Sequence, residues 1–233
     1  MKTENLQNSL LKLPKGERLP RDFFTRDGLI VAKELLGKIL VHETKVGTIR
    51  GVITEVESYM GVEDKGSHTY GGRRTERTEP MFHIGGTSYV YFTYGMYHCM
   101  NITTDVVDNP QAVLIRSVVP ADIESQERML DLRLEASLAS IRKRKEAKGE
   151  ELTSEEIESK KKSLLKHLAD GPGKLCIAMG VTKEQNDVDM VESTSFYVTE
   201  GINVLPEEIQ AGKRIGIDYA EEAADYLWRF YII

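Results

Sequence analysis

Apolar and polar residues are spaced along the chain in the patterns of several strands and a few helices. Residues 27–41 place apolar side chains at helical spacing and then become strand-like after Gly37. Residues 48–60 alternate, with Glu55 and Glu57 between apolar positions, which predicts a strand buried on one face. The first quarter of the chain therefore predicts a helix followed by strands.

The middle of the chain predicts further strands. Residues 87–104 have the pattern of two strands that meet at a Tyr-Gly pair, and residues 112–120 form another apolar run of strand length. Residues 61–80 are rich in glycine and charge, which predicts a loop. Near the carboxyl end, residues 214–232 predict a strand, a loop and an aromatic strand.

Helical spacing dominates residues 121–169. Within this segment, Thr153 and Glu156 have the spacing of a capping box ahead of a lysine-rich helix. Residues 171–181 predict a turn and a short helix. Strands and helices do not alternate as in a doubly wound fold, so the pattern favours an α/β domain of the α+β type. We expect a single mixed domain with a curved, largely antiparallel sheet, flanking helices and a protruding β-hairpin.

Composition and charge add little to this picture. The chain has 233 residues, 40% of them apolar and 29% charged, as in ordinary globular proteins, and its net charge is -6. The acidic excess lies in residues 183–233, so the larger part of the chain is close to neutral. Net negative charge argues against a nucleic-acid partner, but a local basic surface in that larger part stays open.

Cysteine and histidine usage bounds the cofactor chemistry. Cys99 and Cys176 are isolated, which disfavours a disulfide framework, a zinc finger and an iron–sulfur cluster. The five histidines form no HExxH pair, so we expect no metal and no cofactor. The chain starts without the apolar stretch of a secretory signal, and no apolar run approaches the roughly 20 residues of a membrane span. These features predict a cytoplasmic protein with no membrane partner.

Aromatic residues gather in one segment, YVYFTYGMYHCMN at residues 89–101, which holds four of the ten tyrosines of the chain. Aromatic residues are good strand formers, so packing within a sheet explains most of these rings. Tyr94 is different, because a ring at the predicted hairpin tip has nothing to cover. Such a ring suggests a wedge that inserts between stacked bases.

A candidate base lies upstream of this segment. In the stretch EVESY, Glu57 and Tyr59 share one face of the predicted strand, and His68 follows across a short loop. A carboxylate beside aromatic rings can act as a general base, although a solvent-facing glutamate on a sheet is the commoner interpretation of one such residue. The tyrosine-rich hairpin, the loop GGRRTER and a lone Arg116 ending an apolar strand favour a functional site.

These stretches together resemble the alkyladenine (3-methyladenine, methylpurine) DNA glycosylase family. The resemblance rests on LLGKILV, GVITEVESYMGVEDKGSHTYGGRRTERTEPMF, GGTSYVYFTYGMYHCMNI, AVLIR, GPGKLC and RIGIDYA…WRFYI, which cover most of the chain in order. The combination of EVESY with YVYFTYGMYHCMN is highly specific. The resemblance implies a single DNA glycosylase domain over residues 1–233 that acts as a monomer on double-stranded DNA.

The resemblance also implies a role for each matching residue. Glu57 corresponds to the residue that activates the attacking water. Arg116 and the backbone carbonyl of Ile215 correspond to the groups that hold this water. The remaining residues correspond to a pocket for a flipped base and to an intercalating side chain: Tyr59, His68 and Tyr91 form its walls, Asn101 screens bases at its floor, and Tyr94 enters the duplex.

The implied activity is that of base-excision repair. Such an enzyme flips a damaged nucleotide out of the duplex and hydrolyses its N-glycosyl bond, which leaves an abasic site. The implied substrates are alkylated or deaminated purines: 3-methyladenine, 7-methylguanine, hypoxanthine and ethenoadenine. No lysine within the matched site motifs is a candidate nucleophile at the sugar, so we expect a monofunctional glycosylase.

Two features depart from the family pattern. Residues 124–168 form a charged helical segment that is longer than expected, with RKRKEAK at 142–148. Extra phosphate contact is one interpretation, but the mixture of charges favours a solvated helical face. Gly173 stands where serine is expected, which leaves backbone amides and Lys174 as phosphate contacts there.

Two other functions fit parts of the pattern. A catalytically silent module that binds DNA or RNA by tyrosine stacking would explain the aromatic segment, but it needs no carboxylate at Glu57. A formyltransferase-type RNA-binding domain would share the architecture, but the presence of both EVESY and AVLIR disfavours it.

Overall fold

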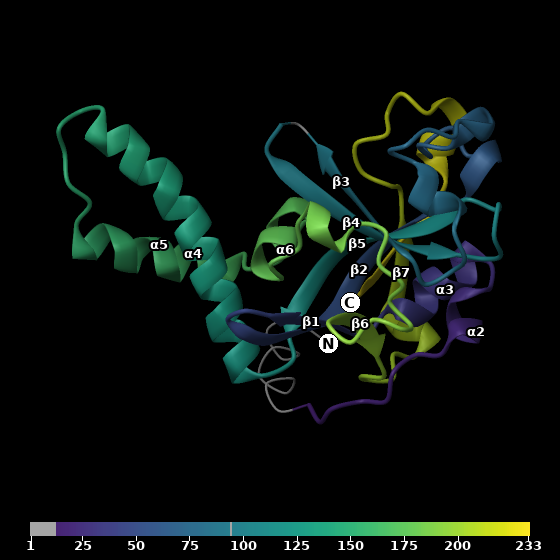
Figure 1. Cartoon of the computed structure of the whole chain (residues 1–233), viewed down its shortest axis with the longest axis horizontal. Coiled ribbons are helices and arrows are strands. Elements are labelled where there is room, and N and C mark those ends of the chain that lie inside the picture. Colours follow the sequence, from purple (N-terminus) through teal and green to yellow (C-terminus); the bar gives the residue numbers. More distant parts are fainter. Residues whose placement is uncertain (1–12, 94) are drawn as a thin grey trace.

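An antiparallel sheet of eight strands forms the body of the protein in the computed structural model (Figure 1), which describes residues 13–93 and 95–233. The main path of the sheet is β3-β4-β5-β2-β1-β6, and β8 pairs with both β2 and β7. Every described strand pair is antiparallel, which confirms the predicted fold class. The strands are Ile39–Thr44 (β1), Gly47–Tyr59 (β2), Ser88–Thr93 (β3), Tyr97–Thr104 (β4), Gln111–Pro120 (β5), Phe196–Thr199 (β6), Ile209–Gly212 (β7) and Arg229–Ile232 (β8).

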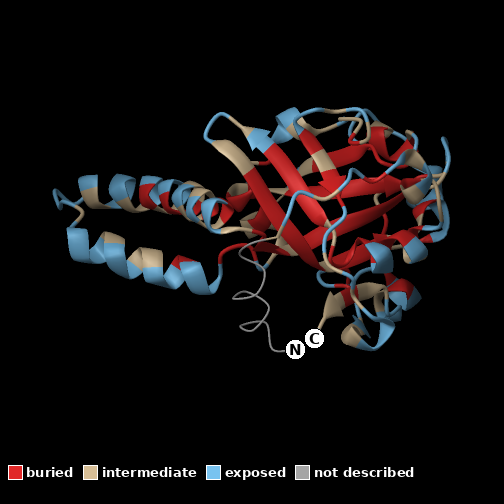
Figure 2. Ribbon diagram, turned by 90° about the horizontal axis from the view of Figure 1, so that it is seen from below, coloured by how far each residue is buried: buried red, intermediate tan, exposed pale blue. Residues whose placement is uncertain are grey.

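Helices flank this sheet, and short 3-10 turns occupy the loops between them. The main apolar core includes side chains from α3, α4 and α6 together with β2, β4 and β5, and Figure 2 shows the strands as the most buried part of the molecule. No helix within residues 13–93 and 95–233 is long and apolar enough to cross a membrane. The helices are Arg21–Phe24 (α2), Gly28–Leu35 (α3), Ile123–Glu146 (α4), Ser154–Lys166 (α5) and Pro172–Ala178 (α6).

The helices α4 and α5 form an arm that projects from the body (Figures 1 and 2). Thr153 caps α5 as predicted: its hydroxyl oxygen accepts a hydrogen bond from the Glu156 amide at 3.3 Å, and the Glu156 carboxylate accepts from the Thr153 amide at 2.9 Å. Leucines from both helices pack into a small cluster of their own, separate from the main core. The predicted helical segment is therefore two helices that stabilise each other.

The predicted hairpin is formed by β3 and β4: the whole of β3 pairs with residues 97–102 of β4, on either side of Gly95. Tyr94 lies outside the described residues, so its predicted role stays a prediction. Side chains at this tip are exposed: 54% of Phe92, 66% of Met96 and 40% of Tyr97. Exposed apolar side chains that gather at one tip are a common feature of surfaces that contact a partner.

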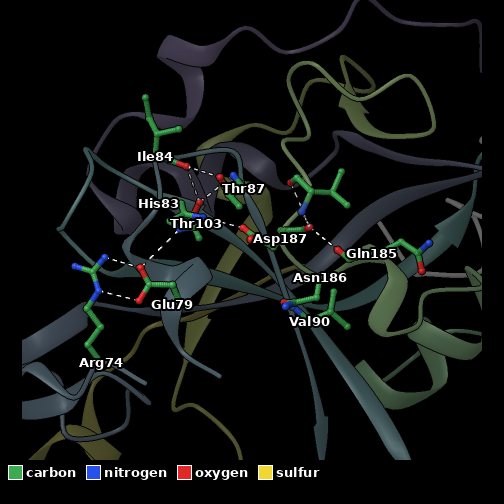
Figure 3. A network of polar contacts seen from close by, with 12 residues as sticks. Arg74, Glu79, His83, Ile84, Thr87, Val90, Thr103, Gln185, Asn186 and Asp187 are labelled. Atoms are coloured by element: carbon green, nitrogen blue, oxygen red, sulfur yellow. Dashed lines mark hydrogen bonds and ion pairs between the residues drawn. The ribbon is translucent and has the colours of Figure 1, made fainter. Parts of the chain in front are cut away.

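A polar network fixes the base of the hairpin (Figure 3). His83 Nδ1 lies 2.8 Å from a carboxylate oxygen of Asp187, and His83 Nε2 lies 3.8 Å from one of Glu79. The neighbouring Asn186 accepts a hydrogen bond from the amide of Val90 in β3 at 2.8 Å. Segments that are about a hundred residues apart in the sequence therefore hold the hairpin in place.

The central strand β2 changes the face that it presents to the core halfway along its length. Ile53 and Val56 are three residues apart, yet both belong to the main core. The pairing with β5 is irregular at Glu55, between these two residues. Because alternate residues of a strand face opposite sides, this irregularity turns Glu57 away from the main core.

Two predictions from the sequence are wrong. Residues 48–60 do not form a half-buried strand, because β2 is central, other elements cover both of its faces, and none of its residues is exposed. Residue Arg214 does not start a strand: the strand lies earlier, at β7, and Gly216 then adopts φ +79°, which an extended strand cannot accommodate.

Candidate active site

A cavity of about 220 Å³ lies where β2, β3, β4 and β5 meet the loops that follow β2 and β7. Pockets for drug-sized ligands span roughly 300–1,000 Å³, so this cavity suits one planar ring system. Its wall includes four tyrosines and one histidine, and it contains most of the residues predicted from the sequence. The lining includes Tyr59, His68, Met81, Tyr89, Tyr91, Cys99, Asn101, Arg116, Ile215 and Tyr219.

Glu57 lies directly behind this wall and is fully buried. The Tyr59 hydroxyl donates a hydrogen bond to its Oε2 at 2.9 Å, and the Ile215 amide donates to its Oε1 at 2.8 Å. Tyr59 and Ile215 both line the cavity. The carboxylate of Glu57 therefore lies one hydrogen bond behind the cavity wall. The interpretation of Glu57 as a solvent-facing residue is therefore wrong.

Arg116 on β5 supplies the positive charge that faces Glu57. Its Nη1 lies 3.2 Å from Glu57 Oε1, and its Nε donates to Glu55 Oε1 at 2.9 Å. Arg229 on β8 donates to the same Glu55 oxygen at 3.0 Å. Two carboxylates and two guanidinium groups thus alternate across β2, β5 and β8, and this row offsets part of the cost of burying the charges.

The buried position of Glu57 changes its acidity. Burial raises the pKa of Glu57 above its ordinary value, against the opposing effects of Arg116, the Ile215 amide and the Tyr59 hydroxyl. A carboxylate with a raised pKa binds a proton more readily than an exposed one. That property suits a group that must accept a proton from water.

His68 and Tyr91 form one side of the cavity. Their ring centroids are 4.7 Å apart at 74°, and His68 Nδ1 lies 2.9 Å from the hydroxyl oxygen of Tyr89. Burial, together with the positive charges of Arg77 and Arg73, lowers the pKa of His68 to about 4. The imidazole is therefore neutral at neutral pH and does not repel a cationic ligand.

Asn101 on β4 lines the cavity and is buried. Its side-chain Nδ2 donates to the backbone carbonyl of Tyr89, its partner in the β3–β4 pairing, at 3.1 Å. This bond fixes the orientation of the amide. An amide held in this way can exclude ligand groups that would overlap with it.

A second cavity, of about 410 Å³, adjoins the first and shares His68 and Tyr219 with it. Its lining includes Arg73 and Arg77. Lys65 and Glu221 also line it, but they form an ion pair at 2.6 Å and offset each other's charge. Positive charge therefore lies beside the aromatic cavity although the chain as a whole is acidic. This is a local basic surface of the kind that the charge distribution left open.

The structure brings together seven of the eight predicted site residues, and the eighth, Tyr94, lies outside the described residues. For Ile215 it shows a bond through the amide to Glu57, whereas the predicted contact to water is through the carbonyl. Other residues of the cavity wall were not predicted from the sequence. Two of them, Tyr89 and Cys99, could have been predicted from the register of the hairpin. They pair with Asn101 and Tyr91, so each lies on the same face as a predicted residue.

No group of three or more His, Cys, Asp or Glu side chains in the described parts of the chain is placed to hold a metal ion. The chemistry available to the cavity from the chain itself is a buried carboxylate, a guanidinium group and a set of rings. Such a site suits an enzyme that hydrolyses a bond next to an aromatic heterocycle.

The chain belongs to the methylpurine-DNA glycosylase family, whose sequence profile matches residues 22–233. It is a DNA glycosylase, an enzyme of base-excision repair in a family that acts on alkylated purines, and DNA is its substrate. This agrees with the resemblance seen in its motifs and disfavours a catalytically silent binding module.

Relatives cover nearly the whole chain. A protein of Clostridium acetobutylicum is 46% identical over 215 residues, which are 92% of this chain and 94% of that protein. A Clostridium perfringens protein is 45% identical and a Desulfitobacterium hafniense protein 43% identical, each over 216 residues and 95% of its own length. All three are provisionally named 3-methyladenine DNA glycosylases.

Excision of a cationic lesion is expected to depend on the ionisation of Glu57. In a plot of the excision rate against pH, the rate should rise as Glu57 loses its proton, and we call this part of the plot the acidic limb. Because burial raises the pKa of Glu57, the midpoint of the acidic limb should lie above the ordinary value of 4.5. Single-turnover excision of 7-methylguanine, measured from acidic to neutral pH, reports this midpoint. A limb near 4 would report His68 instead, and a flat profile would remove Glu57 from the proton transfer.

Proposed function

We propose that this glycosylase flips a damaged purine into the aromatic cavity and hydrolyses the bond between the purine and its sugar. The observation that carries the proposal is the buried carboxylate of Glu57 directly behind a cavity of the size of one planar base. A binding module gains nothing from a buried charge at this place, because burying it costs free energy. A hydrolytic enzyme needs that group as its base.

Entry of the base requires that the nucleotide leaves the stack, at a cost of a few kcal/mol that is lower for a damaged base. The exposed hairpin tip supports a wedge role for Tyr94, which would fill the space left in the duplex. Tyr59 and Tyr91 then offer their ring faces to the base. A cationic alkylated purine gains about 2 kcal/mol or more from such faces when water is excluded.

The chemical step uses one water molecule. Glu57 accepts a proton from this water while the water oxygen attacks C1′ of the sugar. The N-glycosyl bond breaks at the same time, and its electron pair goes to the departing purine. Arg116 and the carbonyl of Ile215 hold the water in this proposal. The products are the free base and an abasic site whose C1′ carries the hydroxyl.

Substrate preference follows from the leaving group. A cationic base such as 3-methyladenine or 7-methylguanine departs readily, and 3-methyladenine is the base in the provisional names of the relatives. Hypoxanthine and ethenoadenine are neutral and need a proton as they leave. Action as a monomer and a cytoplasmic location are parts of this proposal, and a DNA substrate is consistent with that location.

Replacement of Glu57 by glutamine is expected to abolish base release and to leave DNA binding nearly unchanged. The amide keeps the shape of the side chain but cannot accept the proton. Single-turnover excision of 7-methylguanine and gel-shift affinity for the same duplex measure the two effects. Glu63→Gln, an exposed carboxylate beyond the same strand, is the control and should behave as the wild type. Near-normal excision by Glu57→Gln would contradict the proposal.

The enzyme is expected to be monofunctional. No lysine lines the cavity in the described residues, so the sugar has no amine with which to form a Schiff base. Borohydride added during turnover should trap no protein–DNA complex, and the product strand should stay intact until the abasic site is cleaved by alkali. A trapped covalent complex would show that a nucleophilic lysine takes part.

Asn101→Ser is expected to speed the removal of guanine-type bases relative to hypoxanthine. Guanine carries a 2-amino group that would press on the Asn101 amide, and this amide cannot swing away because it is bonded to the Tyr89 carbonyl. Relief of a misfit of about 1–3 kcal/mol corresponds to a change of roughly 5- to 150-fold in the ratio. Excision of 7-methylguanine and hypoxanthine is measured side by side. An unchanged ratio with lower rates on both would mean that Asn101 only supports the sheet.

A further inference from the structure

A buried ion pair joins the two loops that enclose the cavity. Arg214 directly precedes Ile215 in the loop after β7, and Asp64 lies in the loop after β2. The side chains of both are fully buried. Arg214 Nη2 donates to Asp64 Oδ1 at 2.7 Å and Nη1 donates to Oδ2, so the pair is bidentate. Bidentate guanidinium–carboxylate pairs fix orientation as well as distance.

Each partner also binds the backbone of its surroundings. The Asp64 carboxylate accepts from the amides of Met60 at 3.0 Å and Gly66 at 2.9 Å. Arg214 donates to the carbonyls of Ser58 at 3.0 Å and Ala223 at 3.1 Å. One ion pair therefore fixes the end of β2, the turn after it and the loop from β7 to β8.

The guanidinium of Arg214 is stacked as well as hydrogen bonded. It lies 4.8 Å from the ring centroid of Tyr59 and 5.0 Å from that of Trp228. Tyr59 is the residue that donates from its hydroxyl to Glu57 Oε2. The residue after Arg214 donates from its amide to Glu57 Oε1. Both of these donors to Glu57 are thus placed by the same guanidinium group.

We propose that Asp64 and Arg214 are positioning residues for the reaction, which hold the Ile215 amide and the Tyr59 hydroxyl against the two carboxylate oxygens of Glu57. The inference rests on the proposed role of Glu57 as the general base. Stability alone is a weak reason for the pair, since apolar residues often serve as well in a buried position. Arg214 Nε is moreover buried without a hydrogen-bond partner among the described residues.

Loss of the pair is expected to act through Glu57. The Ile215 amide and the Tyr59 hydroxyl both lower the pKa of Glu57, so weakening them raises it further and moves the acidic limb of excision to higher pH. The charged and titratable groups that face Glu57 otherwise stay in place in such a variant. They are Arg116 on β5, Glu55 on β2 with its partner Arg229 on β8, and Cys99 on β4.

The chain contains a matched control for this pair. Lys65, the residue after Asp64, forms ion pairs with Glu221 at 2.6 Å and Glu222 at 2.8 Å, and so joins the same two loops. These two carboxylates are 72% and 58% exposed. Exposed ion pairs contribute little because water screens them. Lys65→Gln and Asp64→Asn therefore remove neighbouring links between the same loops, one exposed and one buried.

The test compares Asp64→Asn, Arg214→Lys and Lys65→Gln in single-turnover excision of 7-methylguanine from a duplex, as a function of pH. Asp64→Asn and Arg214→Lys should lower the rate at neutral pH by about ten- to a hundredfold and shift the acidic limb upward by about one pH unit. Duplex affinity should change far less than the rate. Lys65→Gln should keep the acidic limb and the neutral-pH rate of the wild type, because its ion pairs do not reach Glu57.

Thermal unfolding of each variant distinguishes positioning from a folding defect. Unfolding is therefore measured at each pH of the assay. A rate loss that follows the folded fraction reports a folding defect, whereas a misplaced base moves the limb under conditions in which the variant is fully folded. If Asp64→Asn unfolds, Arg214→Lys serves as the second variant. It keeps the positive charge but cannot form the bidentate contact with Asp64. An unshifted limb in a folded variant overturns the inference while an inactive Glu57→Gln still supports the proposed function. Normal excision by Glu57→Gln would overturn both.

Discussion

The site depends on keeping the carboxylate of Glu57 out of water. Removing a charge from water costs several kcal/mol, and the protein offsets this cost with donors from three separate elements. Tyr59 lies on the same strand, Arg116 on the neighbouring strand, and the Ile215 amide on a loop more than 150 residues further along the chain. The base is therefore a property of the assembled sheet and loop, and no single segment carries it.

Local patterns in the sequence predicted the elements that local chemistry determines. The helix and strand over residues 27–41, the capping box at Thr153 and the hairpin around Gly95 all follow from spacing between near neighbours. The likeness of the motifs to a known family supplied roles that spacing alone could not. Glu57 and Tyr59 were predicted on one face of a strand, and the hydrogen bond between their side chains confirms that they share a face, while their roles stay predictions.

Other features depend on pairing between distant segments. The irregularity in β2 at Glu55 exists only in the register with β5, so the apparent alternation over 48–60 suggested a half-buried strand. Asp64 lies in a predicted loop and Arg214 at the start of a predicted strand, and charged residues in such places are usually exposed. Asp64 and Arg214 are buried because the loops after β2 and β7 pack against each other in the folded chain, and the sequence alone does not show this contact.

A crystal structure of the Glu57→Gln variant with a duplex that contains ethenoadenine tests the central claim most directly. The account predicts that the purine lies in the aromatic cavity between Tyr59, Tyr91 and His68, with the substituted side chain directly behind it. A base that stays stacked in the duplex, or that occupies the neighbouring cavity lined by Arg73 and Arg77, would contradict it.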